Sequence, residues 1–126
     1  MNLKEKAGLI YDALEDKKGN HICVLSIEGL SIMTDCFVIA DGENTNQIQA
    51  MADSVEEALG RQGITVTAIE GQAASGWILM DYGDIIVHIF EKSMRSFYDL
   101  ERLWRDGISL SREDLHAMRE NAEKDQ

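Results

Sequence analysis

Asp81, Asp84 and His88 stand close together in one segment of the chain. Carboxylate and imidazole groups on adjoining strands can hold a divalent metal. The spacing argues against a shared ion, because an extended strand rising about 3.3 Å per residue puts His88 about 13 Å from Asp84. Asp84 also follows Gly83, in a dipeptide that suits a tight turn for conformational reasons. We therefore expect no metal site in this segment.

Other catalytic patterns are equally weak. Metal-held triphosphate chemistry needs paired carboxylates on alternate strand positions, yet no predicted strand carries Asp-x-Asp, and Asp35 and Asp41 bracket one strand six residues apart. Residues 71–76 match no phosphate-binding loop, and no G-x-S-x-G elbow occurs. Cys23 and Cys36 lie in apolar runs, where a small buried hydrophobic role is expected. The sequence predicts a protein that is not an enzyme and has no cofactor.

Aromatic side chains concentrate in one part of the chain. Within 28 residues lie six of the eight aromatics: Trp77, Tyr82, Phe90, Phe97, Tyr98 and Trp104. Trp and Tyr often dominate protein-binding surfaces, because each buries a large area and keeps a polar contact. Core packing explains Phe90 and Phe97 better, whereas for Trp77, Tyr98 and Trp104 core packing and partner contact stay open.

The charge is uneven along the chain. The whole sequence carries 12 basic and 23 acidic side chains, a net charge of −11, while residues 21–91 hold eleven acids and a single base, Arg61. Lys and Arg grip phosphate backbones, so this acidic middle is unsuited to direct nucleic-acid binding. A basic protein surface, or a metal, suits it better as a partner.

The elements that position these residues follow from periodicity and end signals. Helices are predicted at residues 3–17, 45–59 and 96–107, with Asn2 and Asn44 as caps and Gly19 as the left-handed exit of the first. Strands are predicted at residues 21–27, 36–40, 65–70, 77–82 and 85–90, the last two forming a hairpin around Gly83 and Asp84. This order predicts one mixed α/β domain.

The length of 126 residues fits a single domain. No apolar run reaches the roughly 18 residues needed to span a bilayer, and the N-terminus lacks the features of a signal or transit peptide, so we expect a cytoplasmic protein without a membrane partner. We divide the chain into a domain at residues 1–107 and a charged tail at residues 108–126, partly helical or disordered.

Four stretches resemble the ribosomal silencing factor, or Iojap-like, family. They are Ser31 to Ile39, Glu70-Gly71, Gly76 to Phe90 with its GD-x-x-VH hairpin, and Phe97 to Trp104 with Y-x-LE-x-LW. The resemblance covers about residues 3–107. It implies a mixed sheet of about five strands with flanking helices, in a nucleotidyltransferase-like fold without the catalytic carboxylates.

The resemblance also implies a function. Members bind the basic ribosomal protein L fourteen on the intersubunit face of the large subunit, block joining of the small subunit and repress translation when nutrients are scarce. They are often homodimers off the ribosome. The partner-binding residues carried over to this chain are Glu70, Trp77, Met80, Asp81, Tyr82, Arg95, Tyr98, Glu101 and Trp104. The alternative is a metal-dependent enzyme acting on nucleotides, motivated by the fold relationship and the many carboxylates.

Overall fold

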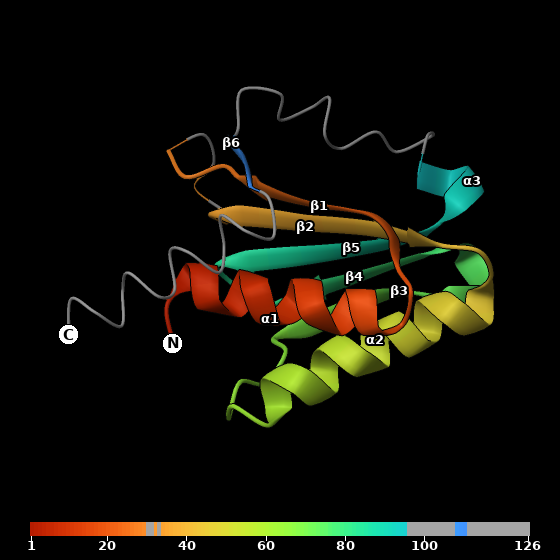
Figure 1. Ribbon diagram of the computed structural model, residues 1–126, viewed down its shortest axis with the longest axis horizontal. Coiled ribbons are helices and arrows are strands. Elements are labelled where there is room, and N and C mark those ends of the chain that lie inside the picture. The colour runs from red at the N-terminus through yellow and green to blue at the C-terminus, as the bar shows by residue number, and fades with distance from the viewer. Residues whose placement is uncertain (30–31, 33, 96–107, 111–126) are drawn as a thin grey trace.

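The computed structural model describes residues 1–29, 32, 34–95 and 108–110. Two long helices, α1 (Leu3–Asp16) and α2 (Thr45–Gly60), lie together on one side of a six-stranded mixed sheet (Figure 1). The mixed α/β class predicted from the sequence is therefore confirmed, with one strand more than the expected five.

Both long helices begin at the predicted caps. The side chain of Asn2 accepts a hydrogen bond from the Glu5 N–H at 2.8 Å, and Asn44 accepts one from the Gln47 N–H at 2.9 Å. These bonds satisfy donors that the first turn of a helix otherwise leaves unpaired. The predicted exit of α1 through Gly19 is wrong, because Lys18 takes the left-handed conformation with φ 61°. Gly19 is instead a close-packing position, where a Cβ would lie 2.8 Å from the end of Met51.

The strands are β1 (Asn20–Ser26), β2 (Cys36–Gly42), β3 (Ala68–Gln72), β4 (Trp77–Asp81), β5 (Ile85–Glu91) and β6 (Ile108–Leu110). Their order across the sheet is β3-β4-β5-β2-β1-β6, with β3 at one edge. The central strands β2 and β5 run parallel, whereas β4 pairs antiparallel with both β3 and β5. The predicted hairpin is confirmed as β4–β5, with Gly83 at φ 85° in its turn.

Some elements differ from the expectation. β3 begins three residues later than predicted, because the strand is defined by its pairing with β4 rather than by the β-branched run before it. A short 3₁₀ helix, η1 (Ala73–Ser75), then leads into β4, and a short helix, α3 (Lys92–Arg95), follows β5. The predicted helix at residues 96–107 lies outside the described residues.

The first residues of the predicted tail, 108–126, form a strand. This strand, β6, pairs antiparallel with β1 at the sheet edge opposite β3. Residues 111–126 lie outside the described residues, so the division of the chain at residue 107 stays a prediction.

The sheet separates two apolar clusters. The larger one fills the space between the sheet and the two long helices and includes Ile10, Leu14, Met51, Val55 and Val87, each almost fully buried. A smaller cluster occupies the other side of the sheet. It contains Leu25, Ile27, Phe37, Ile39 and Phe90, with Trp77 and Met94 packed against it. The chemistry-bearing residues of the hairpin are distributed between these two sides.

Candidate partner-binding face

Strand alternation decides which hairpin residues share a surface. Along β4, Ile78 and Met80 are buried toward the helices, whereas Trp77, Leu79 and Asp81 are half-buried on the opposite side. Glu70 of β3 pairs with Leu79 and is exposed, so it stands on the same side as these three. We call Glu70, Trp77, Leu79 and Asp81 the docking face.

Trp77 is held by two aromatic neighbours from β5. Its ring lies nearly parallel to Phe90 at a centroid distance of 5.9 Å and to His88 at 6.0 Å. Its indole Nε1–H donates a hydrogen bond of 3.3 Å to His88 Nδ1. A side chain so restrained loses little conformational freedom when it meets a partner, which favours its use as an anchor.

The imidazole of His88 supports Trp77 from within the sheet. His88 is 5% exposed, and its ring is nearly perpendicular to that of Phe37 at a centroid distance of 5.2 Å. Burial among these groups lowers the pKa of His88 to about 4, so the ring is neutral at pH 7. A neutral ring leaves Nδ1 able to accept the Trp77 proton, since the second ring nitrogen then carries the hydrogen.

The two acidic groups of the docking face differ in their surroundings. Asp81 accepts a hydrogen bond of 2.7 Å from the Gly83 N–H, which fixes its carboxylate at the hairpin turn. Glu70 is exposed on the edge strand. The face therefore offers one carboxylate oriented by a backbone N–H and one exposed carboxylate, both on the same side of the sheet as the ring of Trp77.

Met80 and Tyr82 do not belong to this surface, in contrast to the expected set of partner-binding residues. Met80 is fully buried and Tyr82 is 8% exposed, both in the cluster under the helices. Burial, together with the charge of Glu56, raises the pKa of Tyr82 to about 12. Alternation along the strand turns both side chains away from Trp77 and Asp81, so they shape the hairpin from behind.

The other predicted partner-binding residues lie at or beyond the end of the described segment 34–95. Arg95 is the last residue of α3, and nothing is described of its side chain. Tyr98, Glu101 and Trp104 lie outside the described residues.

The three candidate metal ligands, Asp81, Asp84 and His88, each interact with a different partner. Asp84 forms an ion pair with Lys6 of α1 at 2.6 Å, Asp81 caps the turn and His88 accepts from Trp77. Among the described residues, no group of three or more His, Cys, Asp or Glu side chains is placed to hold a metal ion.

Asp41 and Cys36 are both buried. The Asp41 carboxylate lies 3.0 Å from His21 Nδ1. Burial raises the pKa of the Cys36 thiol to about 12, so this sulfur is not a thiolate at neutral pH. Cys23 is half-buried, and neither cysteine forms a disulfide.

One residue of the docking face, Leu79, and one that is hydrogen-bonded to Trp77 of that face, His88, were not predicted from the sequence. Leu79 lies between Trp77 and Asp81 on the same side, and period-two alternation from Trp77 was a sufficient signal for it. His88 was assigned no part in the face, because its pairing with Leu79 and its bond to Trp77 depend on the hairpin register.

The chain is similar to known proteins along its whole length. Residues 1–126 match the family described as "Ribosomal silencing factor during starvation". The chain is 39% identical over 106 residues to the Bacillus subtilis ribosomal silencing factor RsfS, covering 84% of this chain and 90% of that protein. The corresponding protein of Halalkalibacterium halodurans is 35% identical over 113 residues, covering 90% and 97% of the two chains.

A solved structure agrees with these matches. A crystal structure of a Chromobacterium violaceum protein superimposes with a TM-score of 0.80 at 34% identity, covering 88% of this chain and 92% of that one. In the part of the chain that the structure describes, no helix has the length and apolar character to cross a membrane. The chain belongs to the ribosomal silencing factor family.

Proposed function

We propose that this protein represses translation by binding a basic protein of the large ribosomal subunit, L fourteen in the resemblance above, and so blocking joining of the small subunit. The docking face carries this proposal, because it sets the stacked ring of Trp77 on the same side of the sheet as the acidic groups Glu70 and Asp81. A mouse relative, 28% identical, is named "Mitochondrial assembly of ribosomal large subunit protein 1", which also points to the large subunit.

The physics of such a face suits a basic partner. Negative charges accelerate encounter with a positive surface and fix its orientation, while a desolvated aromatic anchor supplies much of the affinity. The net charge of −11 favours a protein partner over the phosphate backbone of RNA. Blocking subunit joining then needs only a 14.1 kDa body that stays bound at the joining surface, with no chemical step.

Co-sedimentation with isolated large subunits tests this function. The variant Trp77→Ala with Asp81→Arg is expected to lose binding by at least about tenfold, since a central anchor and a charge are both removed. Because Asp81 also caps the hairpin turn, Glu70→Lys provides a second variant on an exposed site and is expected to weaken binding by about threefold.

The matched control is Asp16→Arg, an exposed charge reversal in the last turn of α1. It changes the net charge as Asp81→Arg does but lies on the helical side of the molecule. Circular dichroism should be native for all variants. Wild-type binding by the double variant, with the fold intact, would show that the proposed face is wrong.

We further propose that the protein is a homodimer off the ribosome and not an enzyme. Light scattering of the protein alone should then give about twice the chain mass of 14.1 kDa. Calorimetric titration with Mg²⁺ and a nucleoside triphosphate should show no saturable binding. Saturation at micromolar concentrations would instead favour the nucleotide-acting enzyme.

A further inference from the structure

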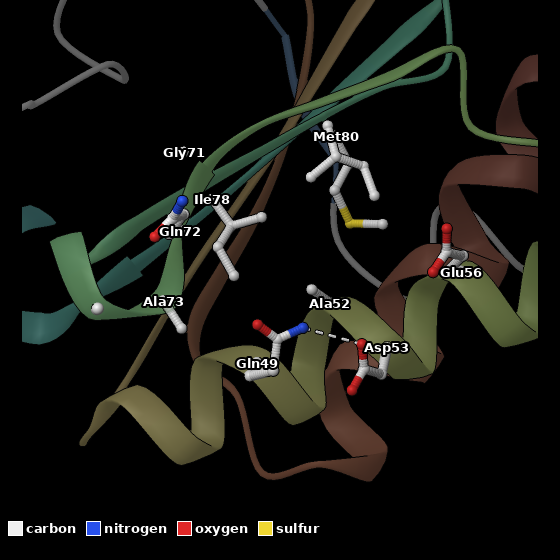
Figure 2. A pocket seen from close by; sticks show the side chains of 11 residues that line it. Gln49, Ala52, Asp53, Glu56, Gly71, Gln72, Ala73, Ile78 and Met80 are labelled. Atoms are coloured by element: carbon white, nitrogen blue, oxygen red, sulfur yellow. Dashed lines mark hydrogen bonds between the residues drawn. The ribbon is translucent and has the colours of Figure 1, made fainter.

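A groove separates α2 from the edge of the sheet, on the side opposite the docking face. It has a volume of about 390 Å³ and is lined by α2, β3, β4 and η1. Figure 2 shows Ile78 and Met80 projecting from β4 toward Ala52 of α2, with Asp53 and Glu56 along the helix beside them. The docking face does not include any of these residues.

Small residues on both walls keep the groove open. Ala52 lies on the α2 side, and Gly71 and Ala73 lie on the opposite wall. Gly71 has φ 78°, and a Cβ there would lie 2.3 Å from the carbonyl oxygen of Trp77, so this position excludes a side chain. Ser75 Oγ donates to the Gln72 carbonyl at 2.7 Å and fixes η1. The groove is therefore built into the local backbone.

The lining combines an apolar floor with an acidic rim. Ile78 and Met80 are almost fully buried at the floor, whereas Ile69 of β3 is 48% exposed along the groove. Asp53 and Glu56 form the rim, and of the lining residues none is basic. An occupant should thus have a long apolar stem and a positive end, as arginine and lysine side chains do.

A second groove, between α1 and α2, gives a useful contrast. It has a volume of about 310 Å³ and also carries two acids, Asp12 and Asp16, but it includes the base Arg61. Arg61 donates to Glu57 at 3.1 Å. The groove beside β3 has no such cation in its lining, so no base of the groove offsets the charges of Asp53 and Glu56.

β3 offers a way for a chain to enter. It is the edge strand of the sheet, pairs with β4 on one side only, and all five of its residues are exposed. A segment added along this edge would point alternate side chains into the groove and toward the face that carries Glu70. A second copy of this chain is a poor occupant, since residues 21–91 carry a net charge of −10.

We propose that the groove between α2 and β3 binds arginine or lysine side chains of an extended basic segment of the partner protein, laid along the edge of β3. The stem would lie along the exposed side chain of Ile69, over the floor that Ile78 and Met80 form, and the charge would meet Asp53 and Glu56. For the identity of that partner, this inference rests on the proposed function. The groove itself can be tested without the ribosome.

The first test titrates the isotope-labelled protein with the peptide acetyl-Val-Arg-Val-Arg-Val-amide and follows its amide NMR signals. We expect shifts to concentrate at residues 52–56 and 68–74. A peptide with citrulline in place of arginine keeps the side-chain length and removes the charge, so it should bind at least about fivefold more weakly. Equal binding of both peptides, or shifts located elsewhere, would overturn the proposal.

Two variants locate the contact. Glu56→Lys reverses the rim charge, and Ala74→Trp, at an exposed lining position, obstructs the groove without changing charge; each should weaken the arginine peptide by at least about fivefold. Asp16→Lys, which reverses an acid in the other groove, should leave binding unchanged. If spermidine shifts the same signals at lower concentration than the peptide, the groove is a polyamine site, which would also overturn a protein segment as occupant.

The second test uses large ribosomal subunits. Glu56→Lys should reduce co-sedimentation relative to Asp16→Lys. Equal co-sedimentation of the two variants, with the wild type bound, would overturn the groove as a partner contact. If the wild type itself does not sediment with large subunits, the proposed function fails, while the peptide titration still decides the chemistry of the groove.

Discussion

Neighbouring residues of β4 point to opposite sides of the sheet, and these two sides differ in residue type and in burial. Toward the helices, Ile78 and Met80 are closed into an aliphatic core, whereas on the other side Trp77 and Asp81 keep part of their surface in solvent. Both sides are restrained, the first by packing and the second by the stacked rings and the bond from Trp77 to His88. The comparison teaches that one strand can supply stability and recognition separately, so the two should respond differently to mutation.

The largest effect is expected on the core side. Met80→Ala removes a fully buried side chain and should lower the free energy of unfolding by about 2–5 kcal/mol, measured by urea denaturation. The adjacent variant Leu79→Ala truncates a half-buried side chain and should cost about 1 kcal/mol. Equal losses at the two positions would contradict the division between the sides.

The next largest effect is the pH dependence of the unfolding free energy, which arises from His88 on the recognition side of the sheet. The unfolded chain protonates His88 near pH 6.5, whereas in the folded state burial lowers its pKa to about 4. Between these values the unfolded state binds more protons, so stability should fall as the pH falls from 6.5 to 4, by roughly 3 kcal/mol in total from this group. Below pH 4, His88 should contribute no further loss.

Urea denaturation at a series of pH values measures this effect, with His88→Phe as the comparison because it keeps an aromatic ring and removes the titration. The difference in slope between the two proteins isolates His88 from the carboxylates. Parallel pH profiles would mean that His88 titrates alike in both states and does not hold Trp77 as a neutral ring.

The smallest effect is expected from the hydrogen bond between the rings of Trp77 and His88. Trp77→Phe keeps an aromatic ring in the stack but removes the donor to His88, leaving a buried acceptor unpaired, and should cost about 1 kcal/mol in unfolding free energy. The pKa of His88 should rise at the same time, because its neutral form loses a hydrogen bond. NMR titration of the imidazole signals checks this, and an unchanged pKa would show that the bond contributes little.

Much of the scaffold could be predicted because its signals are local. The caps Asn2 and Asn44 and the turn glycine Gly83 each act within a few residues, and both helices and the hairpin are found where these residues predict them. The start of β3 was predicted three residues too early. Its limits depend on pairing with β4, and the run of Thr and Val that precedes the strand does not encode this pairing.

The candidate site was harder to predict, for two reasons. The family resemblance grouped Met80 and Tyr82 with Trp77, although alternation places them on opposite sides of the sheet. The groove beside β3 could not be predicted at all, since it depends on Ala52 and Ala73 meeting across the space between a helix and a short 3₁₀ segment. Small residues distant in sequence give no local signal of the hollow that they leave.

The parallel pairing at the centre of the sheet has a consequence for biosynthesis. Cys36 of β2 aligns with Ile85 of β5, so the two innermost strands come from distant parts of the chain with α2, β3 and β4 between them. A nascent chain that has emerged only through α2 therefore lacks the strand that completes its core. Such long-range pairing slows folding, and we expect this domain to fold late in its own translation, after β5 has left the ribosomal tunnel.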